Sequence, residues 1–324
     1  MASSTITLET QVAGTFQESR EIAVGQRHVV HLLAAIAAAC VVVELATAVW
    51  SHSFSSYGRR VEAEYAEAAG LRSGREGKQK TVLIVGNSTL YHGVDILDLR
   101  DQIQPDVDAH VLSLNSMMIE DWYFALKELF RKGARSDFVL LMLPPGHVAN
   151  VAPPTDDVSH YLIGTRDILM LRSAEGIDAT TLSNIFFAQC SMFFGRRNDL
   201  RMLVKSTLFP GFETMASRFM RKRKLTSDYG LVPARFRDIK NLCAQNGARL
   251  LFVIPPTHQE SDTLATPFVL EAAESVGVPA AIPVPNAQLS EDKYADGYHL
   301  NREGQKIFTT ALAEFLRKQA SHEF

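Results

Sequence analysis

The feature that most limits the fold of this chain is a series of short apolar segments that alternate with helical patterns. The first segment, TVLIVG (81–86), is rich in β-branched residues and ends in glycine, as expected for a strand buried on both faces. Similar segments follow at 110–114, 138–143 and 248–254, and a weaker one lies at 278–284. Strands that alternate with helices predict a parallel sheet with helices on both faces, so the expected fold class is α/β.

Four helical patterns accompany these segments. Residues 119–132 place large apolar side chains on one face and charged side chains on the other. The pattern over 233–246 ends in an Asn-Gly pair, a common helix stop just before a strand. Two further helices are expected over 268–276 and 302–318.

Residues 151–230 interrupt the alternation, because they separate the third and fourth strands by far more than one crossover needs. The segment contains several phenylalanines and a basic run from Arg218 to Lys224. We interpret it as a mainly helical insertion, either a lid or docking surface or simply extra helices at the edge of the sheet. A basic run is most often a solvated helix face, with phospholipid headgroups as an alternative partner.

The amino-terminal part has a different character. Residues 1–28 are polar and are interpreted as a flexible tail, whereas 29–50 are apolar and long enough to cross a bilayer core, which needs about 20 such residues. The alternatives are a buried helix of the globular domain and, less favoured because a polar stretch precedes it, a cleaved signal peptide. Residues 51–80 are interpreted as a linker in which 59–69 form a solvated helix. The folded domain is expected over 81–324.

Charge does not decide how this predicted anchor is oriented. Arg20 and Arg27 precede the apolar stretch and Arg59 and Arg60 follow it, so the positive-inside rule gives no preference. Membrane lipid is the expected partner of residues 29–50.

Composition excludes several classes of function. The formal net charge of -3 over 324 residues gives no basic face, so no nucleic-acid partner is expected. The three cysteines form no Cys-x-x-Cys pair and have no histidine at metal-ligand spacing, so no metal site is predicted. No bound cofactor is predicted either.

The first predicted strand runs directly into Gly-Asn-Ser-Thr-Leu (86–90). In an open parallel sheet, ligands bind beyond the carboxyl ends of the strands, and Ser88 lies there. A serine in this turn can present its hydroxyl to a substrate while its backbone N–H helps to bind an oxyanion. Without a partner, a plain turn serine is the simpler interpretation.

A partner lies near the other end of the chain, in Asp-Gly-Tyr-His-Leu-Asn (296–301), just ahead of the last predicted helix. The spacing of Asp296 and His299 lets the imidazole face a nucleophile while the carboxylate fixes its tautomer. Alone, the pair is also explained by a turn-capping aspartate and a surface histidine. Together with Ser88 it predicts a Ser-His-Asp triad, because triad geometry permits this chain order.

These two motifs resemble those of the SGNH (GDSL-like) hydrolase superfamily, over roughly residues 81–318 without the insertion. The resemblance implies a three-layer α/β/α sandwich with a five-stranded parallel, flavodoxin-like sheet. It also implies that Ser88 is the nucleophile, His299 the base and Asp296 the residue that orients the base.

The chain departs from that family where an oxyanion hole is expected. Family members usually carry glycine after the second strand, where this chain has Ser116 and Met117, and asparagine after the third, where it has Pro-Pro-Gly followed by His147. The candidate donors are therefore the backbone N–H groups of Ser88, Ser116 and Met117, together with the His147 side chain. Losing one donor typically lowers the rate by about two to three orders of magnitude. Either His147 substitutes, or activity is low, or the site transfers acyl groups with the help of a partner.

A proline pair after the fourth strand, in Ile-Pro-Pro-Thr-His-Gln-Glu (254–260), adds to the resemblance. With the predicted anchor, it resembles the branch that contains the alginate acetylation and teichoic acid D-alanylation proteins. That branch implies an acylated carbohydrate or envelope polymer as substrate and a membrane-bound O-acyltransferase as partner. It also implies a single-pass protein of the cytoplasmic membrane with its catalytic domain outside, on the periplasmic side in a Gram-negative cell.

The sequence therefore favours a membrane-anchored serine acyl esterase or O-acyltransferase that acts on cell-envelope or exopolysaccharide acyl groups. The main alternative is a non-catalytic scaffold that binds polymer or an acyltransferase. A soluble lipase-like esterase with an unrelated apolar leader is the third hypothesis.

Overall fold

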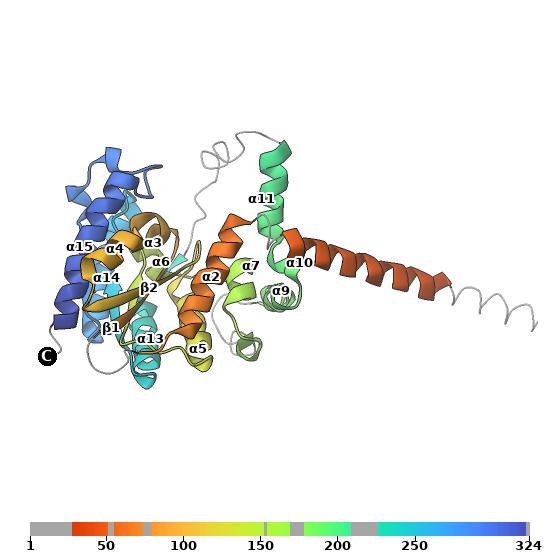
Figure 1. Ribbon diagram of the computed structural model, residues 1–324, viewed down its shortest axis with the longest axis horizontal. Coiled ribbons are helices and arrows are strands. Elements are labelled where there is room, and N and C mark those ends of the chain that lie inside the picture. The colour runs from red at the N-terminus through yellow and green to blue at the C-terminus, as the bar shows by residue number, and fades with distance from the viewer. Residues whose placement is uncertain are drawn as a thin grey trace, which may run out of the picture. The chain divides into compact units, whose positions relative to one another are not determined.

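The computed structural model (Figure 1) describes residues 28–50, 55–73, 79–151, 154–168, 178–208 and 226–321. The chain forms two units, residues 1–53 and 54–324. In the first unit, His28–Trp50 is a single helix of 23 residues that is long and apolar enough to cross a membrane. The second unit is an α/β domain.

A five-stranded parallel sheet forms the centre of the second unit, in the order β2-β1-β3-β6-β7. Its strands are β1 (Lys80–Gly86), β2 (Val107–Ser113), β3 (Phe138–Met142), β6 (Arg249–Val253) and β7 (Ala280–Ala281). This order is that of flavodoxin-like sheets, in which strand order reverses next to the first strand. The predicted α/β class and its five parallel strands are confirmed.

Helices cover both faces of this sheet (Figure 1). One face packs against α2 (Ser56–Gly70), α5 (Ile119–Arg131), α13 (Val232–Gln245) and α14 (Glu260–Ser275), and the other against α3 (Ser88–Gly93), α4 (Ile96–Ile103) and α15 (Arg302–Ser321). Two hydrophobic cores result, one around Trp122 and Phe236 and the other around Phe308 and Leu312. Strands that are buried on both faces are continuous apolar runs, which explains the sequence of β1 and β3. The predicted three-layer sandwich is confirmed.

Three of the four predicted helices agree closely with α5, α13 and α15, but the prediction for α14 is wrong at its start. That helix begins at Glu260 and continues through Pro267. Its buried face consists of Asp262 and small residues, so the apolar pattern of its first half is weak. Proline also removes a backbone donor, which favours a boundary at that point in a sequence-based prediction.

The interpretation of residues 51–80 as a linker with a solvated helix is wrong for α2. Ser55 caps this helix by accepting a hydrogen bond from the backbone N–H of Gly58 at 3.0 Å. Val61 and Ala68 are fully buried in the core that contains α5, and α2 contacts β2. The buried residues of α2 are small, and this weakens the periodic apolar signal that normally identifies a packed helix. The folded domain therefore begins before Thr81.

The insertion leaves and rejoins the domain at one place. Strands β4 (Asn150–Val151) and β5 (Thr226–Ser227) pair antiparallel, and the backbone N–H of Asp228 donates to Ala149 O at 2.9 Å. Between them, the described residues form α7 (Asp156–Tyr161), α9 (Ala179–Cys190), α10 (Met192–Gly195) and α11 (Arg197–Leu208). The basic run Arg218 to Lys224 lies outside the described residues.

The remaining short helices lie in connections. They are α6 (Pro145–Ala149) and the 3-10 turns η1 (Thr165–Asp167), η2 (Tyr229–Leu231), η3 (Asn286–Gln288) and η4 (Glu291–Lys293).

Candidate active site

Ser88 lies just beyond the carboxyl end of β1, where the strand order reverses and ligands of such sheets bind. Asn87 caps the next helix: its Oδ1 accepts hydrogen bonds from the backbone N–H and the hydroxyl of Thr89 at 2.9 and 2.7 Å. Ser88 is therefore the first residue of α3. Its backbone N–H belongs to the helix-start amides that have no carbonyl partner within the helix.

The structure brings Ser88, His299 and Asp296 together, although Ser88 and His299 are 211 residues apart. Ser88 Oγ lies 2.9 Å from His299 Nε2, and Asp296 Oδ2 lies 2.8 Å from His299 Nδ1. Both distances are hydrogen-bond lengths. The imidazole can therefore take the serine proton at one nitrogen while the carboxylate accepts a hydrogen bond from the other.

The loop before α15 holds Asp296 in position. Asp296 Oδ1 accepts hydrogen bonds from the backbone N–H groups of Tyr298 and His299 at 3.0 and 2.7 Å. Gly297, with φ of 79°, supplies the left-handed residue of this turn. Partial burial opposes ionisation, but hydrogen bonds from the backbone and ring of His299 and the backbone of Tyr298 outweigh it and lower the pKa of Asp296. The carboxylate therefore stays charged at neutral pH and can accept the hydrogen bond from the ring of His299.

The loops after β1, β2 and β3 begin side by side. The backbone N–H of Leu114, at the start of the second loop, donates to Gly86 O at 3.2 Å, and Gly86 pairs in register with Met142 of β3. Ser116 and Met117 follow β2, and His147 lies in α6 after β3. The predicted oxyanion residues thus share one edge of the sheet with Ser88, although within the described residues none of them is hydrogen-bonded to it.

Ser116 has a left-handed backbone with φ of 61°, a conformation that costs a residue with a side chain about 1 to 2 kcal/mol. This is the region where the resembled family usually carries glycine. We expect Ser116→Gly to stabilise the domain by about 0.5 to 1 kcal/mol, since glycine relieves the strain but gains freedom in the unfolded chain. Denaturant unfolding of the detergent-solubilised chain measures this gain. An equal gain in Ser116→Ala, which keeps the Cβ atom, would exclude backbone strain as the cause.

His147 is largely buried. Burial lowers the pKa of its imidazole, and the nearby charge of Asp262 only partly opposes this effect. At neutral pH the ring is therefore neutral and offers one N–H as a donor.

Asp262 joins the loops after β3 and β6. Its carboxylate is buried and accepts hydrogen bonds from the backbone N–H of Gly146 and the hydroxyl of Thr257, both at 2.9 Å. A Cβ atom on Gly146 would lie 2.8 Å from Asp262 Oδ1, so any larger residue here would displace this buried carboxylate. The two loops that carry proline pairs are therefore held in one arrangement next to His147.

Asp121 holds the other end of the loop that carries Ser116 and Met117. Its Oδ2 atom accepts a hydrogen bond from the backbone N–H of Met118 at 2.8 Å. Burial raises the pKa of Asp121 to about 7; the hydrogen bond from Met118 opposes this rise, and the neighbouring charge of Glu120 adds to it.

The raised pKa gives Asp121 an unusual effect on stability. Between about pH 4 and pH 7 the folded protein keeps a proton that the unfolded chain has lost, so the contribution of this group to stability falls as pH rises. We expect Asp121→Asn to be more stable than the wild type at pH 8 by up to about 4 kcal/mol and to lose this advantage towards pH 4. Urea unfolding across this range measures the effect. Asp101→Asn, at an exposed position of α4, is the matched control and should show no such crossover.

Two residues near the triad were not predicted from the sequence. His92 lies one helical turn after Ser88 in α3, and its ring centroid is 4.7 Å from that of His299. Partial burial lowers the pKa of His92, as do the charges of His299 and Arg60, against the opposing charge of Asp296. Residues four apart lie on the same side of a helix. The spacing of Ser88 and His92 therefore indicates that they are neighbours only if α3 is known to begin at Ser88.

Arg60 connects α2 to the site. Its Nη1 donates to the hydroxyl of Ser113 at 2.5 Å and to Glu64 Oε1 at 2.8 Å. Its guanidinium carbon lies 4.2 Å from the ring centroid of Tyr91, the residue before His92. Nothing in the sequence singles out Arg60, because the pattern of α2 predicts a solvated helix.

No protein-family model matches this chain, and no curated protein matches it. Among solved structures it is similar to the psychrotrophic esterase EstA from Pseudoalteromonas sp., with 12% identity, coverage of 75% of this chain and 99% of that chain, and a TM-score of 0.40. It is also similar to a member of the lipolytic protein G-D-S-L family from Veillonella parvula DSM 2008, with 13% identity and a TM-score of 0.38. The match covers 72% of this chain and 96% of that chain.

Proposed function

We propose that this chain is a membrane-anchored serine esterase or O-acyltransferase of the SGNH type. The observation that carries the proposal is the continuous hydrogen-bonded series from Ser88 Oγ through the His299 ring to Asp296. A serine alcohol is a weak nucleophile unless a base takes its proton, and this arrangement supplies the base and a carboxylate to orient it.

In the proposed reaction, Ser88 Oγ attacks the carbonyl carbon of an acyl ester while its proton passes to His299 Nε2. The backbone N–H groups of Ser88, Ser116 and Met117, with the side chain of His147, are the proposed donors to the negative oxygen of the tetrahedral intermediate. The carbon–oxygen bond to the leaving alcohol then breaks, and that alcohol takes the proton from Nε2. Water or a second alcohol reverses these steps on the Ser88 ester and releases the acyl group.

The proposed substrate is an acylated carbohydrate or envelope polymer, and the proposed partner is a membrane-bound O-acyltransferase. The support is the resemblance of the triad motifs and of the proline pair at 255–256 to the acylation branch, together with the apolar helix His28–Trp50. We propose on the same grounds that the domain lies outside the cytoplasmic membrane, with lipid around residues 29–50.

The second candidate is a non-catalytic scaffold that binds polymer or an acyltransferase. The observation that favours it is the changed oxyanion region, where Ser116 occupies a left-handed position and the proline pair 144–145 replaces the asparagine region of the family. A scaffold would keep polymer acylation in cells that carry Ser88→Ala but lose it on deletion of the protein.

Covalent labelling tests the enzyme proposal directly. A fluorophosphonate probe is expected to modify the full-length wild type at Ser88 and to leave Ser88→Ala unlabelled, with the site located by peptide mass spectrometry. Ser261→Ala, at an exposed serine of α14, is the matched control and should label like the wild type. Absence of labelling in a folded wild-type protein would favour the scaffold.

A further inference from the structure

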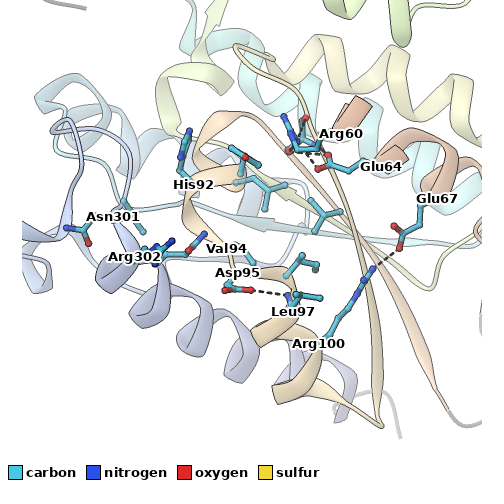
Figure 2. Close-up of a pocket in the computed structure, with 17 residues that line it drawn as sticks. Arg60, Glu64, Glu67, His92, Val94, Asp95, Leu97, Arg100, Asn301 and Arg302 are labelled. Atoms are coloured by element: carbon cyan, nitrogen blue, oxygen red, sulfur yellow. Dashed lines mark hydrogen bonds and ion pairs between the residues drawn. The ribbon is translucent and has the colours of Figure 1, made fainter. Parts of the chain in front are cut away.

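A groove of about 730 Å³ (Figure 2) is lined by His92, the residue whose ring contacts that of His299. Figure 2 shows Arg60, Glu64 and Glu67 of α2 on one side of this groove and His92 and Arg302 on the other. The floor is apolar and includes side chains of α3, α4 and β2. We call it the α2 groove.

The α2 groove adjoins the histidine of the triad. Its lining includes Leu90, Tyr91 and His92, which come shortly after Ser88 in α3, and Leu300, Asn301 and Arg302, which directly follow His299. His92 lines the groove, and its ring contacts the ring of His299 at a centroid distance of 4.7 Å. In triad chemistry the alcohol that leaves or enters exchanges its proton with the histidine, so it occupies the histidine side of the site. The α2 groove therefore lies on the side of the site where the leaving or entering alcohol binds.

The charged walls of the groove neutralise one another. Arg60 pairs with Glu64 at 2.8 Å and Arg100 pairs with Glu67 at 2.6 Å. A site for a polyanion would present unpaired cations in a row, whereas Arg60 and Arg100 already have carboxylate partners. The third arginine of the lining, Arg302, is balanced by the carboxylate of Asp95, which lines the same groove. The charge balance favours an uncharged ligand.

Two polar side chains around the apolar floor are available to hydrogen-bond a ligand. Among the described residues, neither the ring nitrogens of His92 nor the side-chain amide of Gln305 has a hydrogen-bond partner, and both line the groove. The ring of Tyr91 lines it too and is 47% exposed. A sugar or polyol presents C–H groups to an apolar floor and hydroxyls to such polar groups, so its chemistry matches this surface.

We propose that the α2 groove binds the alcohol of the acyl-transfer reaction, an uncharged polyhydroxylated molecule, and that His92 selects it by accepting a hydrogen bond from one of its hydroxyls. The inference rests on the proposed function and specifies its acceptor site. In the transfer step, the alcohol oxygen bonds to the acyl carbon and its proton passes to His299 Nε2. The bond from that carbon to Ser88 Oγ breaks, and Ser88 Oγ takes the proton from Nε2.

The partition of the acyl-enzyme between an added alcohol and water tests this proposal. The full-length protein in detergent receives 4-nitrophenyl acetate and methyl β-glucoside, and the ratio of acetylated glucoside to free acetate is measured. This ratio does not depend on the fraction of active enzyme. We expect His92→Phe and Gln305→Trp each to lower it by about tenfold or more, as does replacing the glucoside with glucuronate. Leu264→Ala, an exposed position on α14, should leave it unchanged.

The two levels of the proposal fail differently. An unchanged ratio in both groove variants, or equal transfer to glucuronate, overturns the α2 groove as the acceptor site while ester hydrolysis stands. A wild type that releases no 4-nitrophenol overturns the proposed function. In that case, saturation-transfer NMR of methyl β-glucoside with the Ser88→Ala protein tests whether the α2 groove binds an uncharged polyhydroxylated molecule. A signal that disappears in Gln305→Trp supports binding in the α2 groove. If the wild-type sequence at this position gives no signal, or if the signal persists in Gln305→Trp, binding in the groove is overturned.

Discussion

Replacing Asp296 by asparagine is expected to lower kcat/KM for ester hydrolysis by about 10⁴-fold. The amide oxygen of asparagine can still accept the backbone N–H groups of Tyr298 and His299, as Asp296 Oδ1 does, so the turn is preserved. The amide NH₂ then faces His299 Nδ1 in place of Oδ2. Two donors cannot share that contact, so the ring proton moves to Nε2 and leaves no lone pair there to accept the proton of Ser88.

Initial rates with 4-nitrophenyl acetate measure this loss, and the matched control is Asp292→Asn. Asp292 lies four residues earlier in the same connection and bonds the ammonium of Lys293 at 2.7 Å, away from the triad. Its variant should keep the activity of the wild type. A loss of less than about tenfold in Asp296→Asn, with unchanged thermal unfolding, would show that Asp296 does not set the tautomer of His299.

The convergence of Ser88, His299 and Asp296 could be predicted from the sequence because the two motifs lie at places that the topology determines. Ser88 follows the most regular strand of the chain, and Asp296 and His299 precede the last helix. In a parallel sheet the connections after the strands meet at one edge, so these motifs converge even though no contact between them is visible in the sequence. The hydrogen bond between Ser88 and His299 shows that the two motifs meet at this edge.

The wall formed by α2 could not be predicted in this way. Its buried positions are Gly58, Val61 and Ala68, so the helix packs closely without large apolar side chains. Its contact with the groove is made by Arg60 and Glu64, and their spacing of four residues is equally typical of an ion pair on a solvated helix. The identity of a charged residue does not reveal whether it faces water or a groove, and only the packing of α2 against β2 decides this.

Strands β1 and β3 approach each other closely just before the turn that carries Ser88. Gly86 ends β1, and a Cβ atom at this position would lie 2.5 Å from the backbone oxygen of Met142 and 2.9 Å from Leu90 Cβ. The carbonyl belongs to the paired strand β3 and cannot rotate away, so Gly86→Ala must push the strands apart or move the turn that carries Ser88. We expect a destabilisation of about 3 kcal/mol, at the upper end for an overpacked core.

Gly70→Ala, at the end of α2 with open space around its Cβ position, is the matched control and should stabilise the chain by up to about 1 kcal/mol. Urea unfolding of the full chain compares the two variants. If Gly86→Ala unfolds at the same urea concentration as the wild type, the ends of β1 and β3 are farther apart than this geometry, and the position derived for the Ser88 hydroxyl is wrong.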